Sequence, residues 1–216
     1  MSDEPQLPDT NDQELHETVP ASDEAGMTAS YRIVEGASPA LEFDCPAYCV
    51  ITAAKGAFLA KAPAIAVEPH AEFTGLDNYR NDSNENEILY LSPSSTGSLI
   101  AFHMQIHKNG LILSSSSLFA VTHDVALSLV VDVELEGLAG PYQLYQVTGE
   151  GTVVAFMSGD LFPLTLDDDD VLQVDARALA AMAPSIGFEL EQLANGQYVA
   201  SLTGPGRVWL QSMPSQ

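Results

Sequence analysis

The chain repeats itself, and this repetition constrains its fold more than any other feature of the sequence. Short apolar segments recur at residues 57–60, 117–120 and 178–181. Each is followed by a second apolar segment, and these begin at Ile65, Val125 and Ile186, at offsets of 60 and 61 residues. Regular spacing of this kind is typical of folds that use one supersecondary unit several times.

A second pattern recurs as well. Residues 97–102, 151–156 and 206–211 align, and each copy follows a strand-like segment at 89–91, 144–147 or 198–202. Together the two patterns predict three modules near residues 31–102, 103–157 and 158–213. Residues 68–87 then form an insertion in the first module.

Local patterns predict strands rather than helices. Residues 131–136 alternate apolar and acidic side chains, which is typical of a strand with one wet face. Residues 175–182 offer at most one helical turn, and Gly204-Pro205-Gly206 fits a type II turn with Gly206 at positive φ. We therefore predict an all-β, mainly antiparallel fold, with a β-sandwich or barrel-like body built from three repeated strand modules.

Charge divides the chain into two parts. Its 216 residues contain 30 acidic and 7 basic side chains, for a net charge of −23. Such a charge disfavours binding to nucleic-acid backbones or to anionic lipid. Residues 1–30 carry eight acidic and no basic side chains, together with three prolines. We predict a disordered acidic tail over residues 1–30, either solubilising or a docking segment, and a single β-rich domain over residues 31–216.

Targeting signals are not apparent in the sequence. The first residues are acidic and polar, unlike a signal or transit peptide. No run of 18 apolar residues is present, so we expect no transmembrane segment. Cys45 and Cys49 match neither a zinc knuckle nor a redox pair, and in an extended segment they lie ~13 Å apart, too far for a disulfide. We expect reduced thiols and a cytoplasmic protein.

Residues with catalytic or metal-binding chemistry form no recognised motif. His103 and His107 would share one face of an extended strand, but only the fold can supply a third metal ligand, for instance from His123 and Asp124. Four consecutive aspartates at 167–170 resemble a solvated hairpin tip more than a calcium loop. The serines at 114–117 have no activating base nearby in sequence, and the acidic residues of the Asn-rich loop at 78–87 have no evident partner. We predict no enzymatic activity, no catalytic residues and no cofactor.

The C-terminal stretch at residues 202–214 resembles the end motif of the altered-inheritance-of-mitochondria protein 24 family, which is similar to the tryptophan-RNA-binding attenuator protein-like fold. Weaker similarity extends over most of residues 40–214. The motif residues, to which we assign a structural role, are Thr203, Gly204, Pro205, Gly206, Arg207, Val208, Trp209, Leu210 and Gln211. The Asn-rich loop and the acidic tail depart from the family pattern. The resemblance implies a β-rich fold of repeated strand units and no assigned activity; fungal relatives are linked to mitochondrial inner-membrane organisation. Without a transit peptide, a prokaryotic cytoplasmic member is the simpler interpretation.

Three functional hypotheses follow. The first is a non-enzymatic scaffold or assembly protein. The second is RNA binding, by analogy with the attenuator-like fold, although the net charge of −23 opposes it. The third is a small-molecule or metal-binding β-module that uses His103 and His107. We expect no nucleic-acid partner.

Adjacent apolar pairs suggest self-association. The strand-like segments contain such pairs at 99–100, 153–154 and 208–209, so both faces of each strand should leave water. Trp209 shares its predicted face with Arg207 and Gln211, a mixture that suits an interface anchor better than a deep core. We expect a homo-oligomer, and the alternative is an internal sandwich that covers both faces within one chain.

Overall fold

The structure is a computed structural model, and it describes residues 29–36, 38–136 and 140–213. The predicted acidic tail therefore lies outside the described residues, apart from Ala29 and Ser30. Ala29 is buried in the first hydrophobic cluster and Ser30 begins the first strand, so the folded body starts slightly before residue 31. Among the described residues no helix is long and apolar enough to cross a membrane.

The prediction of an all-β, mainly antiparallel fold is confirmed, because every strand pairing is antiparallel. One short 3-10 helix, η2, spans Ala176–Ala178. The strands of the first part of the chain are β1 (Ser30–Val34), β2 (Ala40–Cys45), β3 (Val50–Ala54), β4 (Phe58–Lys61), β5 (Ile65–Pro69), β6 (Leu76–Asn81) and β7 (Glu87–Leu91). Those of the middle part are β8 (Gly97–His103), β9 (Leu111–Ser114), β10 (Leu118–Thr122), β11 (Val125–Val133), β12 (Tyr142–Gly149) and β13 (Thr152–Ser158). Those of the last part are β14 (Leu161–Leu166), β15 (Val171–Asp175), β16 (Leu179–Met182), β17 (Gly187–Gln192), β18 (Tyr198–Thr203) and β19 (Gly206–Gln211).

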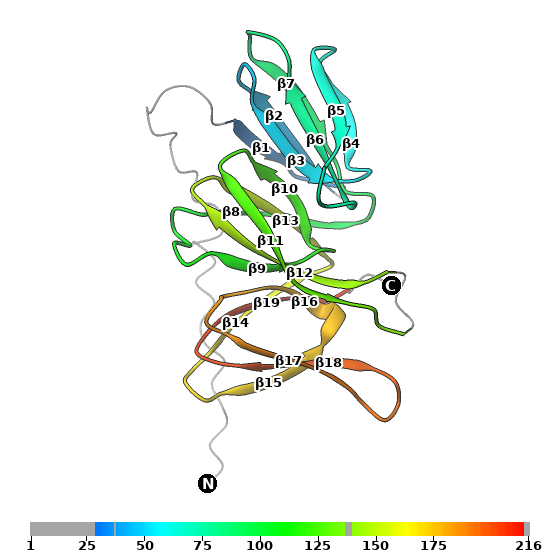
Figure 1. Cartoon of the computed structure of the whole chain (residues 1–216), viewed down its shortest axis with the longest axis vertical. Coiled ribbons are helices and arrows are strands. Elements are labelled where there is room, and N and C mark those ends of the chain that lie inside the picture. Colours follow the sequence, from blue (N-terminus) through cyan, green and yellow to red (C-terminus); the bar gives the residue numbers. More distant parts are fainter. Residues whose placement is uncertain (1–28, 37, 137–139, 214–216) are drawn as a thin grey trace.

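One pairing scheme occurs in three consecutive sets of six strands, which we call the N-terminal module (β2–β7), the middle module (β8–β13) and the C-terminal module (β14–β19). In each module the sixth strand pairs with the first and the third. The fifth strand pairs with the second and the fourth. Figure 1 shows the modules following one another along the long axis of the molecule.

This scheme corrects the second predicted alignment. Residues 97–102 belong to β8, which is the antiparallel partner of β13 and begins the middle module. They are therefore not the counterpart of residues 151–156. The strand that occupies the place of β13 and β19 in the N-terminal module is β7. The first predicted pattern does coincide with structurally matching strands, namely β4, β10 and β16.

The modules are joined edge to edge. β3 of the N-terminal module pairs with β10 of the middle module, and β9 of the middle module pairs with β16 of the C-terminal module. Each join creates a six-stranded sheet with three strands from each of two modules. A four-stranded sheet, β1-β2-β7-β4, and a three-stranded sheet, β15-β18-β17, remain separate.

Alternating side chains explain how the sheets pack. In β2, Leu41, Phe43 and Cys45 point inward while the residues between them are half-buried. β13 is covered on both faces, and its residues from Val153 to Met157 are all buried. The buried side chains form three hydrophobic clusters, and each cluster contains residues of at least two modules. The internal sandwich therefore accounts for the apolar pairs at 153–154 and 208–209 within one chain.

Candidate functional site

The histidine pair does not form one site. The chain turns after β8, with the Ile106 N–H donating to the His103 carbonyl over 3.0 Å, so the segment is not the extended strand that would align both rings. His103 Nε2 lies 3.3 Å from the Tyr31 hydroxyl, and its Nδ1 lies 3.4 Å from Thr152 Oγ1. His107 instead packs edge-on against Phe102, with ring centroids 5.7 Å apart.

The other proposed metal ligand is also occupied elsewhere. His123 Nδ1 lies 2.8 Å from the carboxylate of the adjacent Asp124 on the surface. Over the described ranges, no three His, Cys, Asp or Glu side chains converge to hold a metal ion. Burial lowers the pKa of His107, and the nearby side chains of Arg207 and His103 lower it further, which favours a neutral ring at neutral pH.

The C-terminal motif contains both core and surface residues, and Thr203, Pro205 and Arg207 are exposed. Val208, Trp209 and Gln211 in β19 are buried. The Trp209 ring packs edge-on against Phe102 at 5.3 Å and lies under the Arg207 guanidinium at 5.5 Å. The prediction that Trp209 anchors an interface is wrong, because its 5 % exposure places it among the core of the middle module.

The Gln211 side chain forms hydrogen bonds to both the middle and the C-terminal module. Its side-chain carbonyl accepts from the Ser158 N–H over 3.0 Å, and its amide donates to the Arg177 carbonyl over 3.1 Å. The predicted type II turn before β19 is also wrong. Gly206 does have the predicted positive φ, but its value of 155° is far from the ~80° that the second central residue of a type II turn requires.

The aspartate run is a turn, but it is not the tip of a hairpin. It connects β14 to β15, which belong to different sheets. The turn is closed by its own first and last residues: the Asp170 N–H donates to the Asp167 carbonyl over 3.1 Å, and the Asp167 N–H donates to the Asp170 carboxylate over 2.9 Å. The four side chains are exposed, as the predicted solvated turn requires.

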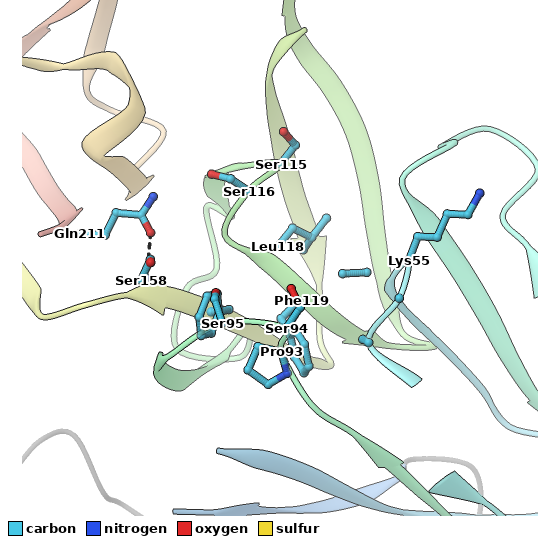
Figure 2. A pocket seen from close by; sticks show the side chains of 14 residues that line it. Lys55, Pro93, Ser94, Ser95, Ser115, Ser116, Leu118, Phe119, Ser158 and Gln211 are labelled. Carbon is cyan, nitrogen blue, oxygen red and sulfur yellow. Dashed lines mark hydrogen bonds between the residues drawn. The ribbon is translucent and has the colours of Figure 1, made fainter. Parts of the chain in front are cut away.

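Ser115 and Ser116 of the serine run line a pocket of about 280 Å³ that lies mostly between the N-terminal and middle modules (Figure 2). Its apolar floor includes Phe119 and Phe156, and its rim carries serine hydroxyls. The Ser114 hydroxyl lies 3.1 Å from those of Ser116 and Ser117, so these groups satisfy one another. No histidine or carboxylate lies among the residues that line the pocket, and Lys55 extends away from the serines in Figure 2.

The two cysteines are closer than an extended segment allows. A turn over residues 46–48 brings the Cys49 N–H within 3.2 Å of the Pro46 carbonyl. Both side chains are buried free thiols. A hydrogen bond between them raises the pKa of Cys45, and burial raises it further; the same bond lowers the pKa of Cys49.

The Asn-rich loop is held by a residue that sequence reasoning missed. The Asn81 side chain is buried, and its amide donates to the carbonyls of Cys45, Pro46 and Glu85 over 2.8–3.0 Å. Asp82 accepts from Arg80 over 2.6 Å, so this loop acidic residue has a partner. The run of Asn and Asp in this loop was the only sequence signal for such a clamp.

More than half of the cationic side chains contact a carboxylate or an aromatic ring. All seven lie among the described residues, and three of them are neutralised by carboxylates: Arg32 by Glu42, Arg80 by Asp82, and Arg177 by Asp175. A fourth, Arg207, covers Trp209.

Two strands lie at the edge of a sheet although the equivalent strands of the other modules are paired on both sides. β4 bounds the four-stranded sheet and β15 bounds the three-stranded sheet, whereas their counterparts lie inside six-stranded sheets. Phe58 and Leu59 in β4 are 51 % and 56 % exposed, and Val171 in β15 is 65 % exposed. Unpaired strand edges with exposed apolar side chains are sites of β-strand addition. These two edges are therefore candidate sites for the addition of another strand, and the sequence did not predict them.

Comparison with known proteins gives one family and one fold. The family model described as "Mitochondrial biogenesis AIM24" matches residues 31–213. A crystal structure of a Streptococcus pyogenes protein, determined by a structural genomics consortium, has a TM-score of 0.73 at 16 % identity, and the alignment covers 86 % of this chain and 94 % of that one. The search of curated proteins gives no match.

Proposed function

The chain belongs to the mitochondrial biogenesis AIM24 family, and from this premise we propose that it works as a non-enzymatic β-rich scaffold or assembly protein that associates with itself. The observation that carries the proposal is the way the modules join. Two sheets are completed by strands from adjacent modules, and two further sheets end at free edges. Because its modules pair through their edge strands, the chain can pair its remaining edge strands with those of another molecule in the same way.

The separation of the candidate residues also supports a role without catalysis. The two histidines contact different neighbours, the pocket serines have no histidine or carboxylate among the lining residues, and the aspartates close their own turn. General acid–base or nucleophilic catalysis requires such groups within hydrogen-bonding reach of one another.

The same proposal assigns the protein to the cytoplasm. Its two cysteines are buried thiols, which is typical of a reducing compartment. RNA binding is disfavoured, because three of the seven cations are paired with carboxylates and the net charge is −23.

Light scattering coupled to size-exclusion chromatography tests the proposal. The full chain has a mass of 23.0 kDa, and we expect a larger mass that rises with concentration in the micromolar range. A mass of one chain at every concentration would contradict self-assembly. Retention of mixed RNA on a filter at physiological salt would favour the RNA-binding alternative instead.

A further inference from the structure

We infer that β15 of one copy of this chain pairs with β4 of a second copy, head to tail, and so joins the three-stranded sheet of the first to the four-stranded sheet of the second. The inference rests on the proposed scaffold function and names its interface. It is argued from the two joins that the chain already makes within itself.

The register of the strands shows which positions correspond between modules. In each module the pairing of the third strand with the sixth contains one register shift. The shifts lie between Phe58 and Ala60, between Leu118 and Ala120, and between Leu179 and Ala181. The residue after each shift faces Tyr90, Val154 and Trp209 respectively. Ala60, Ala120 and Ala181 are therefore equivalent.

The second strands can be matched in the same way. β3, β9 and β15 end at Ala54, Ser114 and Asp175, and in each module three residues separate that end from the start of the third strand. The residues one place before these ends are Ala53, Leu113 and Val174, and all three are buried.

Both internal joins use the same register. Ala53 pairs with Ala120 across the first join, and Leu113 pairs with Ala181 across the second. A third join of this type pairs Val174 with Ala60 of a second copy. One position further along, Gln173 faces Lys61 of that copy, as Thr52 faces Val121 and Ile112 faces Met182.

Burial shows what a join does to these strands. Leu118 and Phe119 in β10 are each 3 % exposed, and Leu179 and Ala180 in β16 are 1 % and 0 % exposed. The equivalent residues in β4 are Phe58 and Leu59, which are more than half exposed. On the other strand, Ile51 and Leu111 are 0 % and 1 % exposed, whereas the equivalent Leu172 is only half-buried. The two free edges thus carry apolar side chains that a join buries in the other modules.

Other edges of the sheets do not qualify. β5, β11 and β17 occupy equivalent places and are all edge strands. β8 and β14 are edge strands as well, and their counterpart β2 is paired with β1, a strand that lies outside the three modules. Within the described structure, none of the modules uses these edges for a join. Among the strands that the structure describes, only β4 and β15 are edges whose counterparts are joined to a strand of another module.

The two edges belong to the N-terminal and C-terminal modules, which lie toward opposite ends of the molecule in Figure 1. A contact between two different surfaces of the same protein is heterologous, so it produces a ring or an open filament rather than a closed two-fold dimer. Each copy then offers one β4 edge and one β15 edge to its neighbours.

Cysteine cross-linking tests the register. K61C and Q173C are prepared separately, mixed, and oxidised under native conditions. We expect a disulfide-linked dimer on non-reducing gels from the mixture, because facing Cα atoms in a sheet lie within disulfide range. The double variant K61C/Q173C gives a ladder of longer species. The matched control is K61C mixed with E191C. Glu191 lies in β17, an edge strand whose counterparts in the other modules are also edge strands, so we expect no such dimer. The buried native thiols make the wild type a second control.

Charged edge variants test the same interface without cysteines. L59D and V171D each place a carboxylate on an exposed edge residue, and V130D places one on the exposed Val130 of β11 as the matched control. We expect light scattering to give the mass of one chain for the first two variants and the wild-type mass for V130D. Circular dichroism verifies that all three fold.

The outcomes separate this inference from the proposed function. In one outcome the wild type associates while K61C and Q173C form no mixed disulfide and L59D and V171D keep the wild-type mass. That result would overturn the β15–β4 interface but not self-assembly. A wild type that stays a single chain and gives no mixed disulfide overturns both.

Discussion

Replacing Trp209 by alanine should destabilise the fold rather than weaken an interface. The ring is 5 % exposed and packs edge-on against Phe102 and His107, with centroids 5.3 and 6.2 Å away. Truncating a buried Trp to Ala costs ~3–5 kcal/mol in free energy of unfolding, since the cavity is only partly refilled. The edge-to-face pair with Phe102 contributes ~0.5–1.5 kcal/mol beyond area burial. Trp209→Phe retains a ring at the site and should lose less.

The assay is equilibrium urea unfolding at a concentration low enough to keep single chains. Far-UV circular dichroism is the signal, because Trp209 is the only tryptophan and its fluorescence disappears in the variant. A loss below ~1 kcal/mol would refute the core placement. If that small loss came with a reduced mass in light scattering, Trp209 would be an interface anchor after all.

Three other predictions concern the chain start, a turn and a histidine. Deleting residues 1–28 should shift the melting temperature by no more than a few degrees in differential scanning calorimetry, because their composition offers almost no core side chains; a larger drop would show that they pack on the body. Gly206→Val should lower the free energy of unfolding in urea by ~1–3 kcal/mol, since Gly206 has a φ of 155° and an added Cβ would meet Ile186 Cδ1 at 2.9 Å. An unchanged free energy of unfolding would contradict this conformation. His107 has a lowered pKa in the fold, so the unfolded chain binds a proton more readily and stability should fall as the pH drops through ~6.5. In His107→Gln that part of the pH dependence should vanish, and an identical pH profile would exclude the effect.

Much of the fold was predictable because strand patterns are local. Alternation in β2 and β11, together with glycine-containing turns, is sufficient to predict an antiparallel β fold. The recurrence of β4, β10 and β16 was also visible, since these strands have similar apolar sequences at similar offsets.

Strand pairing was less predictable, because neighbouring core strands have similar compositions. β8 and β13 are both apolar strands that begin near a glycine, so they align well although they are partners in one sheet. Trp209 was misplaced for a related reason: periodicity shows that both faces of β19 are apolar, but not that a second sheet of the same chain covers them.

The candidate site, the exposed edges of β4 and β15, could not be predicted from the sequence for another physical reason. Phe58 and Leu59 in β4 look like Leu118 and Phe119 in β10, and only the pairing of β10 with β3 distinguishes a buried strand from a free edge. The exposure of an edge is a property of the fold and not of the local sequence.

Amide hydrogen exchange across a concentration series tests the central claim most directly. If β15 pairs with β4 of another copy, amides in Phe58–Lys61 and Val171–Asp175 should exchange more slowly as concentration rises, while the edges β5 and β17 stay unchanged. L59D should remove the concentration dependence at both strands. Protection that rises at β5 or β17 instead, or that does not change at β4 and β15 while the mass increases, would contradict the account.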